Sequence, residues 1–217
     1  MIIVLLGPPG AGKGTQGERL AARLGIPKIA TGDLFRAALR EGTPRGLEAK
    51  QYMERGELVP DAVILGILRE ALTSPEAAGG AILDGAVRTI PQAEGLAETL
   101  AGIGRKVDAV LLFDVDADEL VRRLSTRTTC DVCQTSYTGL EPGTPCPKND
   151  GGTLVRRKDD EPEAIRTRLA VYEQQTAPLV AWYESHGSEV HRIDAIGDLD
   201  TVTARALAAL DRARTAA

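Results

Sequence analysis

Short apolar runs alternate with longer stretches of helical periodicity along this chain. Residues 1–6, 81–83 and 109–115 are almost entirely apolar, and residues 190–193 form a weaker run of the same kind. Between the first two runs, Lys13–Leu24 repeats its apolar residues with helical spacing. Alternating β and α elements at this spacing predict an α/β fold, with a parallel sheet covered by helices on both faces.

Three other segments add to this pattern. Thr31-Gly-Asp33 offers N-cap residues for a helix over 34–40, and the alanine-rich end, 203–217, reads as a terminal helix. Residues 129–152 break the rhythm, because they hold all three cysteines, three prolines and several glycines without a helical period. A stretch of this length is unusual inside a compact domain, so it predicts an inserted lobe stabilised by its own internal cross-link.

Composition narrows the class of protein. The chain has 217 residues, 43% hydrophobic and 26% charged, which suits one domain with inserted lobes. Its net charge of −5 gives no general attraction to nucleic acid or to anionic membranes. The apolar start is too short for a signal peptide, and no apolar run approaches the roughly 18–20 residues that cross a bilayer. We therefore expect a cytoplasmic protein, and a monomer because no heptad or large apolar stripe is left over.

A phosphate-binding loop is the strongest chemical signal. Gly7-Pro-Pro-Gly-Ala-Gly-Lys-Gly-Thr15 follows a predicted strand and precedes a predicted helix. Glycines let backbone N–H groups point inward, the helix adds the positive end of its dipole, and Lys13 adds a full charge for the β- and γ-phosphates. A Ser or Thr that ligates Mg²⁺ normally follows the lysine, but here Gly14 does, and the hydroxyl comes at Thr15. Asp84, after the next apolar run, is our candidate to hold Mg²⁺ through waters.

The loop and several later motifs resemble those of adenylate kinases. The similarity spans nearly the whole chain and is carried by Gly7 to Gln16, Thr31-Gly-Asp-Leu-Phe-Arg36, Gly56-Glu-Leu-Val-Pro-Asp61, Asp84-Gly85 with Arg88-Thr89 and Gln92, Arg157-Lys-Asp-Asp160, and Thr176-Ala-Pro-Leu-Val180. The family normally has Phe-Pro where this chain has Ala86-Val87. Cys130-x-x-Cys133 resembles the long, lid-bearing bacterial type.

The resemblance implies a fold and a division of the chain. The fold is that of P-loop NTPases, with a five-stranded parallel sheet flanked by helices. The core would comprise 1–29, 60–125 and 164–217, a helical AMP-binding lobe would comprise 30–59, and a hinged lid would comprise 126–163. The implied reaction is the Mg²⁺-dependent transfer of a phosphoryl group from ATP to AMP, giving two ADP.

The resemblance also implies roles for individual residues. For ATP these are Gly10, Ala11, Gly12, Lys13, Gly14, Thr15, Arg123, Arg127, Tyr137 and Gly197. For AMP they are Thr31, Arg36, Glu57, Leu58, Val59, Gly85, Arg88, Gln92, Arg157 and Arg168. The catalytic set is Lys13, Asp84, Arg88, Arg123, Arg127, Arg157 and Arg168. Phosphoryl transfer between polyanions needs cations aimed at the moving group, so an arginine-rich site suits this reaction.

The three cysteines have the spacing of a zinc site. Cys130-x₂-Cys133 is followed by Cys146, and zinc prefers four ligands. By resemblance the fourth ligand would stand at Asn149, but Asp150 is the better donor, so we favour Cys130, Cys133, Cys146 and Asp150 around a structural Zn²⁺. The alternative is three free thiols in a lobe held by packing.

Other functions compete with this interpretation. A kinase for another nucleoside monophosphate would carry much the same motifs, although Thr31 and Gln92 favour AMP by resemblance. A nucleotide-dependent regulator whose cysteine lobe binds nucleic acid is a different class, and the acidic charge counts against it. His186 and His191 lie outside every motif and are expected to have no catalytic role.

Overall fold

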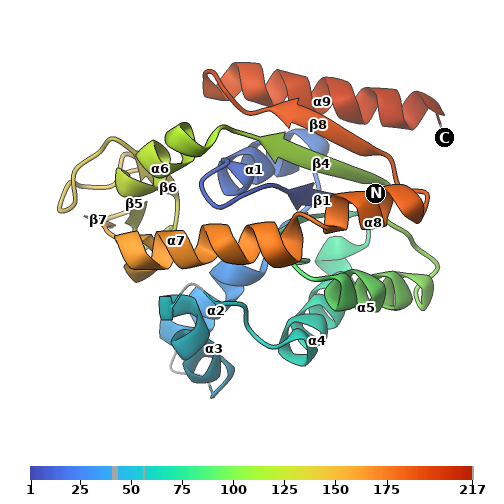
Figure 1. Cartoon of the computed structure of the whole chain (residues 1–217), viewed down its shortest axis with the longest axis horizontal. Coiled ribbons are helices and arrows are strands. Elements are labelled where there is room, and N and C mark those ends of the chain that lie inside the picture. Colours follow the sequence, from blue (N-terminus) through green and yellow to red (C-terminus); the bar gives the residue numbers. More distant parts are fainter. Residues whose placement is uncertain (41–43, 56, 217) are drawn as a thin grey trace.

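A five-stranded parallel sheet forms the centre of the computed structural model, which describes residues 1–40, 44–55 and 57–216 (Figure 1). Its strands lie in the order β2-β3-β1-β4-β8. Their bounds are Lys28–Ala30 for β2, Ala81–Asp84 for β3, Ile2–Leu6 for β1, Ala109–Asp114 for β4 and Val190–Asp194 for β8. The predicted α/β class, the parallel sheet and the four predicted runs are confirmed. The short β2 was not predicted.

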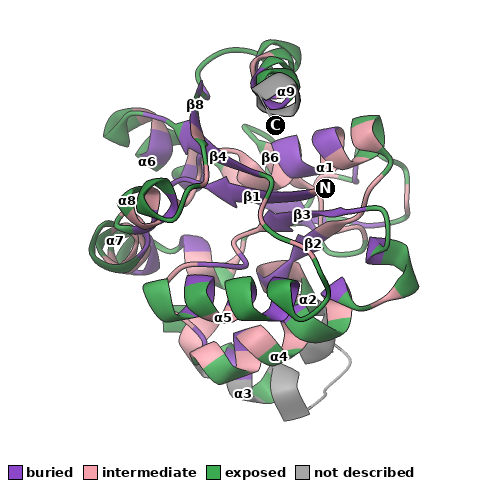
Figure 2. Ribbon diagram, turned by 90° about the vertical axis from the view of Figure 1, so that its right-hand side faces the viewer, coloured by how far each residue is buried: buried purple, intermediate pink, exposed green. Residues whose placement is uncertain are grey.

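Helices cover both faces of this sheet. Side chains of β1 alternate between the two: Ile3 and Leu5 pack toward α1 (Lys13–Leu24) and α9 (Leu199–Ala216), whereas Ile2 and Val4 pack on the opposite side. The helices of that second side are α4 (Asp61–Leu72), α5 (Ile90–Ala101) and α8 (Leu179–Ser185). Buried residues accordingly fill the central strands and the inner faces of the helices (Figure 2). No part of the described chain forms a helix long and apolar enough to cross a membrane.

Two smaller structures extend from the carboxyl edge of the sheet. The first is the helix pair α2 (Thr31–Arg40) and α3 (Pro44–Arg55), while Gly56 of the predicted motif lies outside the described residues. α2 begins at Thr31, three residues earlier than predicted. The reason is that Thr31 and Asp33 do not cap it: the Thr31 hydroxyl donates to Gly85 O at 2.9 Å, and Asp33 pairs with Lys28 and Arg36.

The second extension contains the cysteines. β5 (Arg127–Cys130) lies between β6 (Ser136–Thr138) and β7 (Leu154–Val155) in an antiparallel sheet. It follows α6 (Ala117–Ser125) and leads through the 3₁₀ turn η2 (Lys158–Asp160) into α7 (Pro162–Val171). The remaining elements are the 3₁₀ turn η1 (Pro75–Ala77) and the π-helical turn η3 (Tyr172–Thr176). The predicted inserted lobe is therefore a small separate sheet.

The central sheet should dominate stability. Leu83 is fully buried in β3, whereas the Leu47 side chain on α3 is 57% exposed. We expect Leu83→Ala to lower the free energy of unfolding by about 2–5 kcal/mol, since it loses burial and leaves a cavity. Leu47→Ala, the same chemical change, should stay within about 0.5 kcal/mol. Urea denaturation of both variants checks this, and equal losses would contradict the core described here.

Candidate active site

The loop between β1 and α1 is built for close approach by an anion. Gly7, Gly10 and Gly12 have φ values of 138°, 87° and 90°, which favour glycine. A Cβ on Gly10 would lie 2.9 Å from Leu124 Cγ, so a side chain has no room there. Gly12 is the N-cap of α1 and provides no side-chain cap, which leaves the first N–H groups of the helix for a ligand.

Lys13 lies at the start of α1, with its amine beneath this loop. Its Nζ donates to Gly7 O at 2.6 Å and to Pro8 O at 2.9 Å. Burial lowers the pKa of Lys13 to about 8; Asp84 opposes this shift, while Arg88, Arg168 and Arg127 add to it. An entering phosphate would relieve this burial cost by supplying negative charge.

Asp84 ends β3 next to the same loop. A Cβ on Gly14 would lie 3.3 Å from Asp84 Oδ2, so the carboxylate occupies the space beside the position where other loops carry Ser or Thr. The absence of a side chain at Gly14 therefore lets Asp84 approach the loop. A carboxylate here can hold a hydrated Mg²⁺ beside the phosphates.

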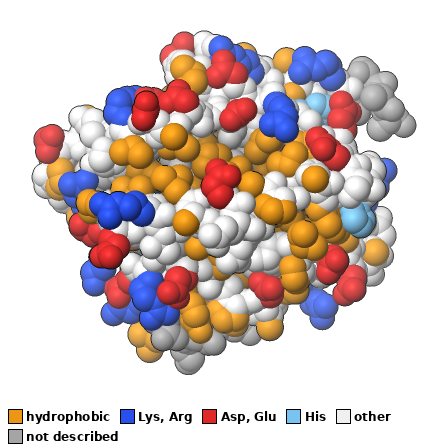
Figure 3. Space-filling model, in the orientation of Figure 1, with side chains coloured by type: hydrophobic (Ala, Val, Ile, Leu, Met, Phe, Trp, Pro, Cys, Tyr) orange, Lys and Arg blue, Asp and Glu red, His pale blue; other side chains and the backbone are white. Residues whose placement is uncertain are grey.

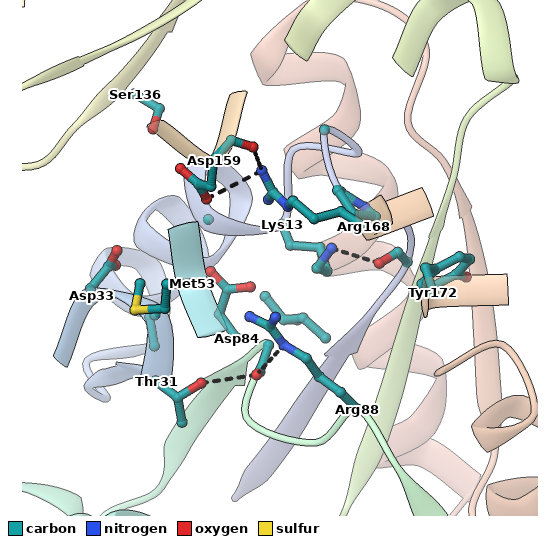
Figure 4. A pocket seen from close by; sticks show the side chains of 18 of the residues that line it. Lys13, Thr31, Asp33, Met53, Asp84, Arg88, Ser136, Asp159, Arg168 and Tyr172 are labelled. Atoms are coloured by element: carbon teal, nitrogen blue, oxygen red, sulfur yellow. Dashed lines mark hydrogen bonds and ion pairs between the residues drawn. The ribbon is translucent and has the colours of Figure 1, made fainter. Parts of the chain in front are cut away.

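A cavity of about 260 Å³ opens above the loop and collects charged side chains from many elements. Its lining includes eight Lys and Arg residues against five Asp and Glu, although the whole chain carries −5. In Figure 4 the side chains of Lys13, Asp84, Arg88 and Arg168 point toward one space. On the face seen in Figure 3, by contrast, acidic and basic side chains are intermingled. Positive charge is thus concentrated in the cavity.

Most residues singled out from the sequence line this cavity. They are Gly10, Gly12, Lys13, Gly14, Thr15, Thr31, Arg36, Glu57, Leu58, Val59, Asp84, Gly85, Arg88, Gln92, Arg123, Arg127, Arg157 and Arg168. Three others lie elsewhere. Ala11 packs in the core, Tyr137 lies in the small sheet with its hydroxyl 3.6 Å from Cys146 Sγ, and Gly197 lies in the loop before α9. That loop is still close to the cavity, because Arg123 donates to Ala195 O at 2.9 Å.

Two adjacent aspartates of η2 hold three of the arginines. Asp160 is almost fully buried and accepts from Arg127 through both carboxylate oxygens and from Arg168 at 3.0 Å. Asp159 pairs with Arg157 at 3.0 Å and with Arg168 at 3.2 Å. Burial alone would raise the pKa of Asp159, but Arg157 and Arg168 outweigh it and hold the pKa well below its usual range.

Arg36 shows that positive charge is still left over. Burial and the like charge of Arg157 both lower its pKa, against the opposing effect of Asp33. Its Nε is buried and has no hydrogen-bond partner among the residues that the structure describes. A buried, unpaired donor is costly, and a bound anion would satisfy it.

Arg88 and Gln92 form a linked pair at one side of the cavity. Gln92 Oε1 accepts from Arg88 N at 2.7 Å, and Gln92 Nε2 donates to Asp61 Oδ1 at 2.6 Å. The amide keeps one further N–H and one lone pair, enough to bind the edge of a base. Arg88 Nε donates to Gly85 O at 3.0 Å, so Ala86-Val87 in place of Phe-Pro still leaves Arg88 directed into the cavity.

Comparison with known proteins agrees with this geometry. The sequence model of the family described as "Adenylate kinase" matches residues 5–188. The adenylate kinase of Gemmatimonas aurantiaca is 66% identical over 97% of this chain and 99% of its own length. The chain belongs to the adenylate kinase family. The adenylate kinases of Syntrophobacter fumaroxidans and Salinispora tropica, at 45% and 48% identity, likewise match 97% of this chain, over 100% and 98% of their own lengths. Adenylate kinases are phosphotransferases, and this family uses Mg²⁺ with ATP.

The cysteine lobe of this adenylate kinase family member brings four donor groups together. The ligand atoms of Cys130, Cys133, Cys146 and Asp150 all lie within 4.8 Å of one another. Cys133 Sγ and Cys146 Sγ are 3.8 Å apart, and Cys130 Sγ is 3.4 Å from an Asp150 oxygen. Tetrahedral Zn²⁺ bonds of about 2.3 Å to sulfur and about 2.0 Å to oxygen imply separations of about 3.8 and 3.5 Å. The four residues therefore fit zinc.

Local backbone geometry explains why Asp150 and not Asn149 joins the cluster. Asn149 has a φ of 53°, a conformation that asparagine tolerates, and its N–H donates to Cys146 O at 2.9 Å. It is the turn residue that directs the chain back toward the sulfurs. Asp150 Oδ1 then accepts from Gly152 N at 2.9 Å, which fixes the carboxylate beside Cys130.

Sequence reasoning missed several cavity residues. Lys28 lines the cavity and pairs with Glu18 at 3.2 Å and Asp33 at 3.3 Å. Tyr172 and Thr176 enter it from the π-helical turn. Lys28 is the first residue of β2, a three-residue strand too short to show a pattern. Thr176 was noticed only as part of a motif, because its partner is 88 residues away.

The zinc site gives one prediction. Chelation, or Cys130→Ser with Cys133→Ser, should lower the unfolding temperature, by about 2–4 °C for each kcal/mol lost in a chain of this size. Phosphoryl transfer should persist at low temperature, because no ligand lines the cavity. Elemental analysis should find zinc in the natural sequence and in Asn149→Gly, but not in Asp150→Ala. Absence of metal from protein purified without chelator, or loss of transfer in a folded zinc-free protein, would contradict this.

Lys13 gives a second prediction. In the free protein its ammonium group loses its proton above a pKa of about 8, so kcat/KM for ATP should fall above that pH. The depressed pKa also makes buried Lys13 a cost to stability below pH 8. That cost is relieved as pH rises from about 8 toward the ordinary value of 10.5. The pH dependence of kcat/KM for AMP, measured at saturating ATP, should be flatter, because bound phosphates keep Lys13 protonated. Identical ATP and AMP profiles would show that another group titrates.

Proposed function

We propose that this chain catalyses the reversible transfer of the γ-phosphoryl group of ATP to AMP, giving two ADP, and so balances adenine nucleotides. The observation that carries the proposal is the convergence of Lys13 and six arginines on one cavity beside a phosphate loop. Two polyanions repel each other, and directed cations offset that repulsion. An ionised AMP phosphate needs no general base to attack, so positioning and charge supply most of the catalysis.

The ATP phosphates are assigned to the loop and to Lys13. Gly10, Gly12, Gly14 and Thr15 would present N–H groups to them. Arg123 would lie against the adenine, near the loop around Gly197. This assignment is supported by the Arg123 bond to Ala195 O, which brings that loop next to the cavity.

The AMP end is assigned to the opposite side. Thr31, Leu58, Val59, Gly85 and Gln92 would surround the base and ribose. Arg36 and Arg88 would hold the AMP phosphate, and Arg157 and Arg168 would reach the moving phosphoryl group. Supporting this, the buried Arg36 Nε has no partner in residues 1–40, 44–55 and 57–216, and Gln92 keeps free hydrogen-bonding capacity.

Mg²⁺ neutralises phosphate charge when it is bound with ATP, and Asp84 would hold it through water. The place of Asp84 beside Gly14 supports this assignment. Asp84 and Lys13 would then lie on either side of the phosphates and fix their orientation.

We also propose the division into a core (1–29, 60–125 and 164–217), an AMP lobe (30–59) and a lid (126–163). A lid that closes over both substrates would exclude water, which prevents hydrolysis of ATP. An ion pair of 3.0 Å between Lys158 of η2 and Glu54 of α3 supports the idea that the lobes meet. Zn²⁺ would have a structural role in the lid. We propose a monomer acting in the cytoplasm, without nucleic acid or membrane as partner.

A coupled assay tests the reaction. ATP plus AMP should yield two ADP, and AMP should exceed GMP, UMP and CMP as acceptor. Lys13→Ala should lower kcat by about 10²–10³-fold while the protein stays folded, because one preorganised charge is lost. Preference for another monophosphate would reassign the acceptor, and near-normal turnover of folded Lys13→Ala would refute the role of Lys13.

A second assay separates the two nucleotide sites. Arg88→Ala should raise KM for AMP or lower kcat/KM for AMP far more than it changes the affinity for ATP. The reason is that Arg88 is tied to Gln92 on the AMP side. Isothermal titration with each nucleotide alone provides the check. A loss confined to ATP would mean that the two sites are exchanged.

A further inference from the structure

The helical rod from α7 to α8 contains one π-helical turn, η3. Its wider hydrogen bond runs from Ala177 N to Tyr172 O at 2.8 Å. Pro178 follows, and a proline lacks an N–H and displaces the carbonyl one turn before it, which favours a widened turn. The extra residue rotates the side chains that follow by about 100° around the helix axis. Thr176, the last residue of this turn, lines the cavity.

The Thr176 hydroxyl bonds outside its own helical segment, as the Thr31 hydroxyl at the start of α2 does. Thr73, Thr99 and Thr167 each donate to a carbonyl of their own helix, four residues earlier. Thr176 Oγ1 instead donates to Arg88 O at 2.8 Å, and the residue is only 8% exposed. The bond joins the π-helical turn to the segment between β3 and α5.

Arg88 depends on such outside support. It lies in neither a helix nor a strand, so regular structure does not hold its backbone. Its N–H donates to Gln92 Oε1 at 2.7 Å, and its carbonyl accepts from Thr176. Both backbone groups of Arg88 are thus fixed by side chains, one from α5 and one from η3. Fixing the backbone on both sides limits the directions in which the guanidinium can point.

We propose that Thr176 is a positioning residue for Arg88: its hydroxyl holds the Arg88 carbonyl and thereby keeps the guanidinium aimed at the AMP phosphate. The proposal rests on the function proposed above, in which Arg88 binds AMP. Thr176 acts through Arg88, and its hydroxyl is already engaged, so it need not touch the substrate.

Three variants test this role. Thr176→Val keeps the shape but removes the hydroxyl, and should lower kcat/KM for AMP by about tenfold, with KM for ATP changed less than about twofold. Thr176→Ser restores the hydroxyl and should stay within about twofold of the natural sequence. Thr99→Val deletes a comparable buried hydroxyl away from the cavity and should leave both nucleotides unaffected. Thermal unfolding of all three controls for folding.

A double-mutant cycle with Arg88→Ala completes the test. If Thr176 works through Arg88, adding Thr176→Val to Arg88→Ala should lower kcat/KM for AMP by less than about twofold relative to Arg88→Ala alone. Three results would overturn the proposal. The first is an equal loss of kcat/KM for AMP in Thr176→Val and Thr176→Ser, and the second is an equal loss for ATP and AMP in Thr176→Val. The third is a further loss of about tenfold when Thr176→Val is added to Arg88→Ala. Normal AMP use by Arg88→Ala would overturn both this proposal and the AMP site. An impaired Arg88→Ala with a normal Thr176→Val would overturn this proposal alone.

Discussion

The cavity depends on holding many like charges together away from water. Cations at such short range repel strongly when the local dielectric constant is low. Asp159 and Asp160 reduce this cost, because each carboxylate forms ion pairs with two arginines. The compensation is incomplete, since Arg36 Nε stays unpaired within the described part of the chain and burial depresses the pKa of Lys13. The positive charge that is left uncompensated favours the binding of phosphate.

The fold supplies the rigid frame that this charge requires. Parallel strands end at one edge, so the loop after β1 and Asp84 at the end of β3 lie side by side. Glycines set how closely these parts approach: Gly14 admits Asp84, and Gly10 admits the side chain of Leu124. Lys13 and Asp84 are thereby held at the ends of α1 and β3, whereas most of the arginines come from the surrounding elements α2, α6, β5 and α7.

Much of this arrangement could be predicted from the sequence. The central strands are continuous apolar runs, and the phosphate loop has a demanding pattern, so both stand out. The three residues of β2 are too few to show periodicity, and the start of α2 was misplaced because neither candidate caps the helix: Thr31 bonds to Gly85, 54 residues away, and Asp33 pairs with Lys28 and Arg36. The contacts of Thr176 and Lys28 were also missed. The Thr176 bond joins segments 88 residues apart, and the Lys28 ion pairs join side chains of three different elements, which periodicity and local motifs do not report.

Asp160 also has a mechanical consequence. The chain enters the cysteine lobe at Arg127 and leaves it before Arg168, and the one buried carboxylate bonds to both. The two backbone crossings are therefore clamped together at the root of the lobe. A movement of the lid proposed above would therefore shift both crossings together rather than one alone.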